Sequence, residues 1–308
     1  MKFPSTFVLT PEVTQALRLH QPIVALESAV ITHGLPQPEN YHLATSLEDE
    51  VRQAGVIPAT TAILDGKIRV GMTPEQIKRL SEENGLQKIS SRDFGIAVAG
   101  QKSGGTTVAG SLVIARTVGI KVFATGGIGG IHRGSIHDIS ADLQELSQSL
   151  LIVVCAGAKA ILDLPATIEY LETMGVPIIG YQTEEFPAFY SRESGIKVDA
   201  TANSPAEVIK IAQAQWEIGL EKAVLVVVPP PSEIAIPANE IESTIQTAVH
   251  EAEELKIKGA AVTPFLLNRV SELTHGASLK TNLALLRNNV RVASELAKEI
   301  SKIQTREI

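Results

Sequence analysis

The stretch Leu150-Leu-Ile-Val-Val-Cys-Ala-Gly157 is a short, continuous apolar run, the pattern of a strand buried on both faces of a parallel sheet. A second such run, Ile120-Lys-Val-Phe-Ala-Thr125, precedes it, and a third spans residues 176–181. Amphipathic stretches over residues 139–149 and 160–174 predict a helix in each of the two gaps. Strands separated by helices of about 10 to 15 residues indicate βαβ units and a sheet covered by helices.

The same alternation continues toward both ends of the chain. Pro22-Ile-Val-Ala-Leu26 reads as another buried strand, and residues 56–70 read as two strands joined at Asp65-Gly66, a favoured hairpin turn. Thr73 and Pro74 are typical of the N-cap and first residue of a helix. The remaining expected segments are a strand–helix pair within 95–119, a strand at 223–228, and helices at 40–54, 205–219, 238–255, 264–274 and 279–303. We therefore expect one α/β domain over residues 1–308, a three-layer α/β/α fold with a mostly parallel or mixed central sheet and a helical C-terminal region.

Composition narrows the function classes. The 308 residues include 34 acidic and 27 basic side chains, a formal charge of −7, and only 4% of them are aromatic. A net negative charge argues against a general nucleic-acid binder, and the one cysteine, Cys155, excludes a disulfide framework and a multi-cysteine metal site. The first six residues lack the apolar core of a signal peptide, and no apolar run reaches the roughly 18 residues of a membrane span. We expect a soluble, cytoplasmic protein without a membrane or nucleic-acid-polymer partner.

Ligands of parallel α/β sheets bind outside the carboxyl ends of the strands, and one such end carries the densest glycine cluster of the chain. This is Thr125-Gly-Gly-Ile-Gly-Gly-Ile-His-Arg-Gly134. Its glycines would let backbone N–H groups approach a ligand, and Arg133 could pair with an anion. The spacing matches neither the dinucleotide fingerprint nor a Walker lysine motif. The segment is either a ligand loop or a plain turn.

Lys159 and Glu27 each follow an apolar strand. A lysine at the mouth of a low-dielectric strand end can have a lowered pKa, which frees its amine to attack a sugar aldehyde. The alternative is a surface lysine at the start of a helix. A carboxylate such as Glu27, placed after four apolar residues, must be satisfied by partners or act as an acid or base.

Asp138-Ile-Ser-Ala-Asp142 is predicted to open a helix. Asp138 could be its N-cap, or Asp138 and Asp142, four residues apart on one helical face, could serve a hard divalent cation through water. His132 and His137 flank the glycine cluster, and the histidines show no His-Glu-x-x-His spacing. A hydrogen-bonding or substrate-contacting role is therefore favoured for both.

Several ordered, unusual strings together resemble one family, pseudouridine-5′-phosphate glycosidase, which is similar to the indigoidine-synthase-A group. The likeness runs from about residue 11 to residue 297. The strings are Val24-Ala-Leu-Glu-Ser28, Thr32-His-Gly34, Ser91-Arg-Asp93, Gly105-Thr-Thr-Val108, Val122-Phe-Ala-Thr-Gly-Gly-Ile-Gly-Gly130, His132-Arg-Gly134, Asp138-Ile-Ser-Ala-Asp-Leu-Gln-Glu-Leu146, Val154-Cys-Ala-Gly-Ala-Lys159, Gly180-Tyr-Gln182 and Thr263-Pro-Phe265.

The resemblance implies a homotrimeric α/β/α enzyme that reversibly cleaves pseudouridine 5′-phosphate into uracil and ribose 5-phosphate with a divalent metal, usually Mn²⁺. By motif position Lys159 matches the lysine nucleophile, Glu27 the proton donor and Asp138 the metal-ligand aspartate. Positions that match substrate contacts or the pocket are Lys88, Val108, Ser140, Ala141, Asp142, Thr125, His132 and Asn282.

Pseudouridine joins C1′ of ribose to a carbon of uracil, so the usual nitrogen or oxygen leaving group is missing. The hypothesis is that Glu27 protonates the ring oxygen and opens the ribose while Lys159 attacks C1′. A two-carboxylate glycosidase pair would not solve that problem by itself. Lys88, Arg133 and backbone N–H groups are expected to hold the phosphate. The scarcity of aromatics favours a uracil site built from hydrogen bonds and aliphatic walls rather than stacked rings.

Two segments depart from the family pattern. The segment between Arg133 and Asp138 is two residues shorter than usual, which affects the approach of Asp138 to a metal and the role of His137. Val228-Pro-Pro-Pro231 stands where relatives commonly read Asn-Pro-x-Pro, so a side-chain amide is missing from a pocket wall or a trimer contact.

Two rival functions remain. A Schiff-base lyase or aldolase acting on another phosphosugar would use the same lysine nucleophile and phosphate-binding groups, and only the pocket for the base would differ. A non-catalytic nucleotide-binding or pigment-pathway accessory protein would bind ligand without turnover. A binder has no evident need for a lysine nucleophile at a strand end, which disfavours the second.

Overall fold

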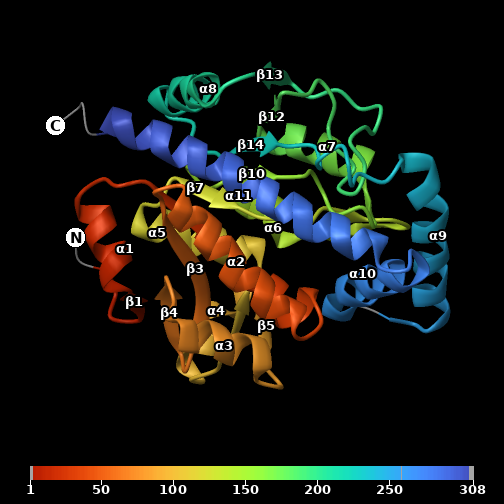
Figure 1. Cartoon of the computed structure of the whole chain (residues 1–308), viewed down its shortest axis with the longest axis horizontal. Helices are drawn as coiled ribbons and strands as arrows, with labels where there is room; N and C mark the ends of the chain where they lie inside the picture. The colour runs from red at the N-terminus through yellow and green to blue at the C-terminus, as the bar shows by residue number, and fades with distance from the viewer. Residues whose placement is uncertain (1–2, 258, 305–308) are drawn as a thin grey trace.

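A large mixed sheet forms the centre of the computed structural model, which describes residues 3–257 and 259–304 (Figure 1). Its strands follow the order β1-β4-β3-β2-β7-β10-β14-β12-β13, with β6 pairing β3 and β5 beside this path. The pairs are parallel, apart from β3 with β4 and β3 with β6. The strands are β1 (Phe7–Leu9), β2 (Ile23–Leu26), β3 (Ile57–Leu64), β4 (Lys67–Val70), β5 (Gln87–Ile89), β6 (Gly104–Thr106), β7 (Val122–Ala124), β10 (Ile152–Cys155), β12 (Ile178–Tyr181), β13 (Ala200–Ala202) and β14 (Val224–Val227).

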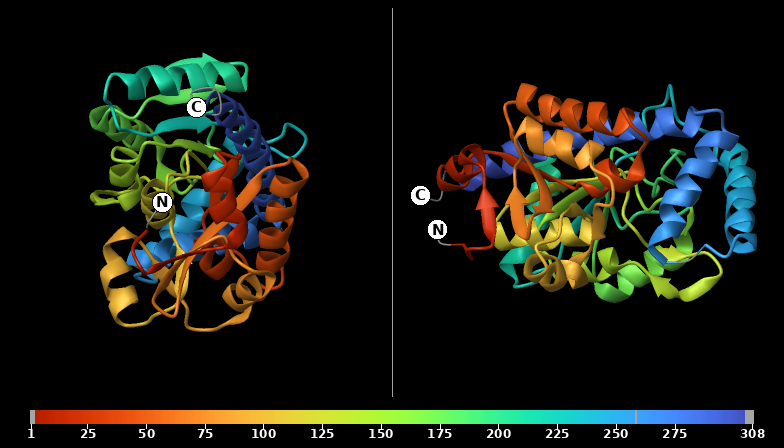
Figure 2. Two further views of the ribbon diagram at one scale, coloured as in Figure 1. Left: turned by 90° about the vertical axis from the view of Figure 1, so that its left-hand side faces the viewer. Right: turned by 90° about the horizontal axis from the view of Figure 1, so that it is seen from below.

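Helices cover both faces of this sheet, as the right-hand view of Figure 2 shows. Helix α11 lies across β2, β7 and β10 together with α2 and α8, while α5, α6 and α7 pack on the opposite face. The helices are α1 (Pro11–Arg18), α2 (Glu39–Gln53), α3 (Pro74–Glu82), α4 (Phe94–Ala99), α5 (Val108–Val118), α6 (Ala141–Leu146), α7 (Leu164–Met174), α8 (Pro205–Glu217), α9 (Ala238–Glu254), α10 (Val262–Leu273) and α11 (Ala277–Gln304). The expected three-layer α/β/α fold with a helical C-terminal region is confirmed.

A second, small sheet lies beside the glycine cluster. It has the order β11-β8-β9, with β8 (Ile131–His132), β9 (Ser135–Ile139) and β11 (Leu162–Asp163). Short single turns complete the described chain: a π-helical turn at Val30–Gly34 and 3₁₀ turns at Ser91–Asp93 and Gly259–Ala261.

Most predicted elements are present because their local signals agree with the packing. The apolar runs are β2, β7, β10, β12 and β14, each fully buried. The Asp65-Gly66 hairpin joins β3 and β4, with both turn residues at positive φ. Thr73 and Gln76 form a capping box at α3.

Three local predictions were wrong. Residues 94–99 form a helix before the short strand β6, so 95–119 is not a simple strand–helix pair. Asp138 lies in β9 because pairing with β8 extends to Ile139, and Ser140 is the N-cap of α6 instead. Helix α7 begins at Leu164 rather than at 160, with Asp163 as its N-cap and Pro165 in its first turn.

The core joins the sheet to both helical layers. One hydrophobic cluster runs from Val13 of α1 to Ile300 of α11 and includes Cys155, as expected of a small buried side chain. Burial raises the pKa of the Cys155 thiol to about 12, so it stays protonated and unreactive near neutral pH. None of the helices in the described ranges is long and apolar enough to cross a membrane.

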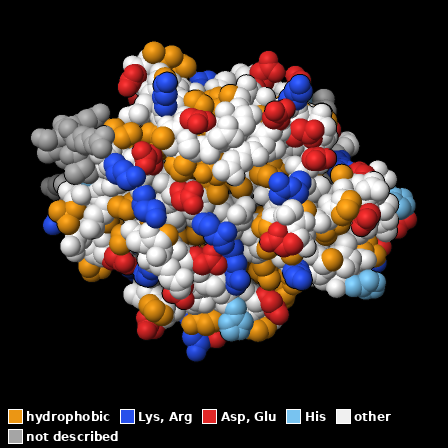
Figure 3. Space-filling model, turned by 45° about the horizontal axis from the view of Figure 1, so that its top comes forward, with side chains coloured by type: hydrophobic (Ala, Val, Ile, Leu, Met, Phe, Trp, Pro, Cys, Tyr) orange, Lys and Arg blue, Asp and Glu red, His pale blue; other side chains and the backbone are white. Residues whose placement is uncertain are grey.

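Surface charges of both signs are intermixed. On the face in Figure 3 acidic and basic side chains alternate over short distances rather than gathering by sign. This pattern agrees with the modest net charge of −7.

Candidate active site

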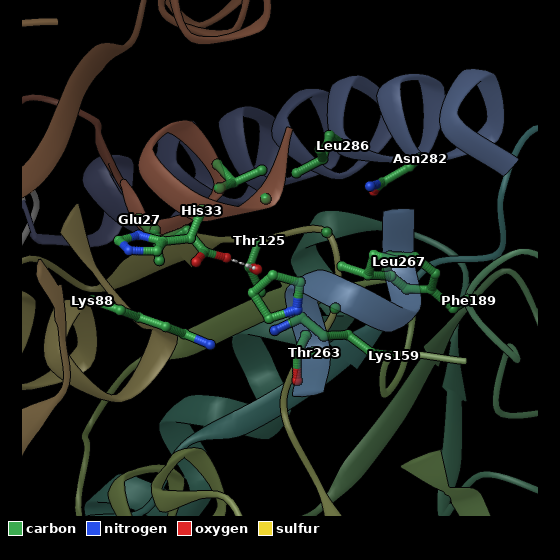
Figure 4. A pocket seen from close by; sticks show the side chains of 16 residues that line it. Glu27, His33, Lys88, Thr125, Lys159, Phe189, Thr263, Leu267, Asn282 and Leu286 are labelled. Atoms are coloured by element: carbon green, nitrogen blue, oxygen red, sulfur yellow. Dashed lines mark hydrogen bonds between the residues drawn. The ribbon is translucent and has the colours of Figure 1, made fainter. Parts of the chain in front are cut away.

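The carboxyl ends of three neighbouring strands bring the predicted catalytic residues together. Strand β7 pairs in parallel with β2 on one side and β10 on the other, so Glu27, Thr125 and Lys159 project from one edge of the sheet. They line one pocket (Figure 4). The full lining is Glu27, Ala29, Val30, His33, Gly34, Lys88, Thr125, Gly126, Gly127, Lys159, Phe189, Thr263, Pro264, Leu267, Asn282 and Leu286.

Glu27 is the acidic group of this pocket. The hydroxyl of Thr125, itself 2% exposed, donates to its Oε1 atom. Burial raises the pKa of the Glu27 carboxyl, and the Lys159 ammonium nearby opposes that shift. A carboxyl with a raised pKa keeps its proton to higher pH than a free glutamate, which suits a general acid.

A buried hydroxyl network holds the strand end that carries Glu27. The Ser28 hydroxyl donates to the Thr61 carbonyl at 2.5 Å and accepts from the Thr106 N–H at 3.0 Å. The hydroxyls of Thr61, Thr106 and Ser111 lie 2.9 to 3.0 Å from one another. Because these groups are satisfied inside the core, they fix β2, β3 and β6 relative to one another and with them the direction of Glu27.

Lys88 enters from a different part of the sheet. It lies on β5, which pairs with β6, and Figure 4 shows its amine pointing toward that of Lys159. Burial lowers the pKa of Lys88, and the like charge of Lys159 lowers it further. The two amines therefore share one confined space in which an anion would relieve their repulsion.

His33 was part of a quoted motif but had no predicted role. It lies on the π-helical turn after β2 and lines the pocket beside Glu27. Its Nδ1 atom is 2.7 Å from the Thr32 hydroxyl. Burial lowers the pKa of His33 and the Lys88 charge adds to this, so the ring is neutral near pH 7. Its place just after a strand end was the signal that could have identified it.

Lys159 is a pocket lysine and not the start of a helix. Its backbone N–H donates to the Ile128 carbonyl at 3.1 Å, and its own carbonyl accepts from the Leu162 N–H at 3.0 Å. Helix α7 begins only at Leu164. The alternative of a helix-start surface lysine is therefore wrong.

The glycine cluster contributes to the pocket through Gly126 and Gly127. A Cβ atom on Gly127 would lie 2.7 Å from the ring of Phe189 and 3.1 Å from the Gly157 carbonyl oxygen. Phe189 has a left-handed backbone, with φ of 62°, and its N–H donates to the Ala156 carbonyl at 3.1 Å. The glycine is therefore needed so that an aromatic ring can close the pocket, which supports the ligand-loop interpretation.

We expect Gly127→Ala to lower the free energy of unfolding by about 1 to 3 kcal/mol, because the added methyl overpacks the contact with Phe189. Chemical denaturation measures this change. Gly95→Ala is the matched control, since a Cβ at that helical position meets nothing within 4 Å. It should be neutral or stabilising by up to about 1 kcal/mol. Equal losses in the two variants would contradict the packing argument.

The end of the pocket away from Lys88 is mainly apolar. Figure 4 shows Phe189, Leu267 and Asn282 gathered there, with Lys159 between them and Lys88. Leu267 and Asn282 fit the expected aliphatic walls and hydrogen bonds, whereas the aromatic ring of Phe189 was not expected. Thr263 and Pro264 belong to a string quoted above but had no predicted role, and Leu267 and Leu286 were not predicted. Their helices, α10 and α11, follow the last strand, so no strand-end rule selects them.

Arg133 does not line this pocket. Its guanidinium donates to both carboxylate oxygens of Glu242, at 2.5 and 3.1 Å, and to the carbonyls of Ala160 and Leu162. The expectation that Arg133 holds a phosphate is therefore wrong, since its donors are engaged elsewhere. The basic groups facing the pocket are Lys88 and Lys159.

Four predicted substrate contacts lie at the starts of α5 and α6, outside the lining of the pocket. Asp142 is buried, and its carboxylate accepts from the Ala109 N–H at 2.8 Å and the Gly129 N–H at 2.7 Å. Ser140 accepts from the Asp142 N–H at 3.3 Å, while Ala141 is exposed and Val108 is the first residue of α5. Asp142 therefore ties the glycine cluster, which includes the pocket residue Gly127, to the start of α5.

Asp138 and His132 lie on the small sheet beside the glycine cluster. Asp138 is exposed on β9, and His132 is half-buried on β8. Burial lowers the pKa of His132, and the charge of Asp138 opposes that shift. Since Asp138 is in a strand and Asp142 is committed to backbone amides, the idea that they share a helical face is wrong. In the described ranges no three His, Cys, Asp or Glu side chains gather as a metal cluster.

The two departures from the family pattern affect different places. The short segment after Arg133 forms a tight β8–β9 turn, with Gly134 at φ of 76°. His137, on β9, is exposed. The Val228–Pro231 segment lies away from the pocket, where Asn288 donates to the Pro229 carbonyl at 3.3 Å and Arg192 to the Pro230 carbonyl at 2.6 Å. The missing amide therefore does not alter the wall of the candidate active site.

Comparison with known proteins identifies relatives over nearly the whole length. Residues 12–299 match the family model described as indigoidine synthase A like protein. Pseudouridine-5′-phosphate glycosidase from Solibacter usitatus is 50% identical over 291 residues, covering 94% of this chain and 97% of that protein. The protein of the same name from Caldanaerobacter subterraneus is 48% identical, covering 96% and 97%.

A solved structure with the same fold contains a bound sugar phosphate. The prealnumycin C-glycosynthase AlnA, in complex with ribulose 5-phosphate, superposes with a TM-score of 0.90 and 37% identity. The match covers 98% of this chain and 99% of AlnA.

Proposed function

This chain belongs to the indigoidine synthase A-like family, and we propose that it is a pseudouridine-5′-phosphate glycosidase. The reaction is the reversible cleavage of pseudouridine 5′-phosphate with water to uracil and ribose 5-phosphate. One observation carries the proposal: an acid with a raised pKa, Glu27, and two lysines, Lys88 and Lys159, face one pocket. The relatives' names and the C-glycosynthase neighbour agree with chemistry at a C–C glycosidic bond.

Ring opening is the first step of the proposed mechanism. Glu27 gives its proton to the ribose ring oxygen O4′ as the C1′–O4′ bond breaks, and the amine of Lys159 forms a bond to C1′. The proton that the amine loses returns to Glu27. The position of Glu27 on the same strand edge as Lys159 supports this exchange.

Bond cleavage and hydrolysis complete the mechanism. Glu27 gives the proton that it took from the amine to C5 of uracil. The C1′–C5 bond breaks with its electrons going to the base, and the nitrogen lone pair of Lys159 forms a protonated imine. Water then hydrolyses the imine to ribose 5-phosphate and the free amine, and the proton released returns to Glu27. Water is the only co-reactant, and Glu27 and Lys159 end as they began.

The two ends of the pocket suggest how the substrate is oriented. The phosphate would lie toward Lys88, whose charge can pair with it, and uracil would lie toward Phe189, Leu267 and Asn282. A flat ring fits an aromatic and aliphatic wall, and the Asn282 amide offers both a donor and an acceptor. Thr125 orients the acid between the two ends.

The deciding experiment follows uracil release from pseudouridine 5′-phosphate with Mn²⁺ present. Uridine 5′-phosphate, with its nitrogen glycosidic bond, is the control and should give no uracil. Release of an aldehyde product from other phosphosugars alone would favour a lyase or aldolase. Saturable binding of pseudouridine 5′-phosphate without turnover would favour an accessory binding protein.

A divalent cation, Mn²⁺ by resemblance, is proposed at Asp138. A carboxylate oxygen is a ligand type that Mn²⁺ accepts, and the neighbouring His132 ring is a second. Because two side chains cannot complete six positions, water and substrate oxygens would fill the rest. The cation would supply charge that orders water and the phosphate or uracil end of the substrate.

We expect Asp138→Asn to weaken Mn²⁺ binding at least about tenfold, because the charged ligand is lost. The signal of free Mn²⁺ in electron paramagnetic resonance measures binding directly, without substrate. Asp49→Asn removes an exposed carboxylate on α2 and serves as the control. Identical titrations of all three proteins would rule out Asp138 as the ligand.

The resemblance also implies a cytoplasmic homotrimer, and we include both properties in the proposal. A lone buried cysteine is compatible with a reducing compartment. Sedimentation velocity would report the assembly, with a single trimer boundary as the expected result.

A further inference from the structure

The guanidinium of Arg133 connects three separate segments. Its Nε donates to the Leu162 carbonyl at 3.2 Å and its Nη2 to the Ala160 carbonyl at 3.1 Å. Nη1 and Nη2 also donate to the two oxygens of Glu242 on α9, at 2.5 and 3.1 Å. One side chain therefore joins the β8–β9 turn, the segment after Lys159 and the start of α9.

The segment that Arg133 binds is the turn that begins at Lys159. Its carbonyl accepts from the Leu162 N–H at 3.0 Å, so residues 159–162 form a closed turn. On the other side the Lys159 N–H donates to the Ile128 carbonyl at 3.1 Å. The backbone of Lys159 is thus held by Ile128 before it and by Arg133 after it. A lysine side chain is flexible, so where its amine can reach depends on this backbone.

Glu242 keeps the guanidinium in place. Hydrogen bonds from Arg133 lower the pKa of Glu242, so its carboxylate is charged near neutral pH. Helix α9 packs against α10, and α10 supplies Thr263 and Leu267 to the pocket. The ion pair between Arg133 and Glu242 therefore connects the 159–162 turn, through α9, to α10, which forms one wall of the pocket.

We propose that Arg133, held by Glu242, is a positioning residue for the nucleophile Lys159. The guanidinium fixes the 159–162 turn so that the amine meets the sugar carbon at the angle needed for attack. The inference rests on the proposed covalent role of Lys159, and it adds that an ion pair outside the pocket sets the rate of that step. Neither Arg133 nor Glu242 is among the residues that line the pocket.

The test measures attack by Lys159 alone. Protein is incubated with ribose 5-phosphate without uracil, reduced with borohydride, and the label on Lys159 is quantified by mass spectrometry over time. We expect Arg133→Ala to lower the maximal labelling rate about 10- to 100-fold, the range seen when a reacting group is misplaced by about 1 Å. The half-saturating ribose 5-phosphate concentration should change less than about threefold. Glu242→Gln should lie between this variant and the wild type.

The chain offers a matched control. Arg269 makes the same two-pronged ion pair with Glu251, at 2.5 and 2.9 Å, between α10 and α9. Arg269→Ala should therefore leave the labelling rate within about twofold. A labelling rate for Arg133→Ala within threefold of the wild type, or an equal fall in Arg269→Ala, would overturn the proposal.

Further outcomes separate this inference from the proposed function. If Arg133→Ala does not fold, Arg133→Lys and Glu242→Gln decide, and unchanged labelling rates in both overturn the inference. A wild-type protein that labels at Lys159 but releases no uracil from pseudouridine 5′-phosphate would refute the substrate assignment, while the variants still decide the positioning role. Absence of any label on wild-type Lys159 would refute both.

Discussion

Lys159→Ala should lower the turnover of pseudouridine 5′-phosphate at least about 10⁴-fold, because the Lys159 amine is the group proposed to form the bond to C1′ that allows carbon–carbon cleavage. Lys88 shares the pocket, but it lies on β5 at the other end from Phe189 and approaches from a different direction. The same variant should also lose the sugar adduct that borohydride traps. The measurements are uracil release and the mass of the tryptic peptide.

The control for this loss is Lys197→Ala, an exposed lysine outside the pocket. It should retain both uracil release and the adduct on Lys159. Full activity in Lys159→Ala would eliminate the covalent mechanism, and an adduct that moves to Lys88 with turnover retained would reassign the nucleophile.

Glu27→Gln should slow turnover about 10²- to 10⁴-fold, the usual contribution of a general acid. The amide keeps the size of the side chain and an acceptor for the Thr125 hydroxyl, so the loss isolates the proton. Glu48→Gln is a close control. Glu48 is also buried, accepts a hydrogen bond from Thr60 at 2.6 Å and has a pKa raised by burial, but it lies outside the pocket. Its turnover should be unchanged, and a fall of less than about tenfold in Glu27→Gln would exclude Glu27 as the principal acid.

The pH dependence follows from the same group. Burial raises the pKa of Glu27 above its ordinary value of 4.5, so the proton stays on the carboxyl to higher pH and leaves as pH rises through the raised value. A general acid works in its protonated form, so turnover should fall on the alkaline side of that pKa. The profile of kcat against pH should show this decline in the wild type and in Glu48→Gln. The decline should be missing from the residual activity of Glu27→Gln.

The sequence predicted the parts of the fold that depend on local signals. Apolar runs and caps are local, so β2, β10 and the start of α3 could be placed directly. The strand-end rule then found Glu27 and Lys159, because parallel neighbours deliver their carboxyl ends to one edge. The prediction was wrong at Asp138, where strand pairing with β8 took precedence over a helix-start motif.

Contacts between residues that are far apart in the sequence could not be predicted in this way. The glycine-rich surroundings of Arg133 predicted that it binds a phosphate. Its partner is instead the carboxylate of Glu242, 109 residues further along the chain. Phe189 lies in an irregular excursion between β12 and β13 with a left-handed backbone, which no periodicity indicates. Neither fact follows from spacing, because each depends on which segments the completed fold brings together.

The order of strands in the sheet has a consequence for how the enzyme would assemble. Strands β2, β7 and β10 are hydrogen-bonded neighbours, but each pairing closes a long loop of chain. Parallel pairings between distant segments form late, since the entropy of loop closure must be overcome before they gain contacts. Glu27 and Lys159 are therefore brought together when β7 has paired with both β2 and β10. Recovery of catalysis after dilution from denaturant would therefore report the pairing of β2, β7 and β10.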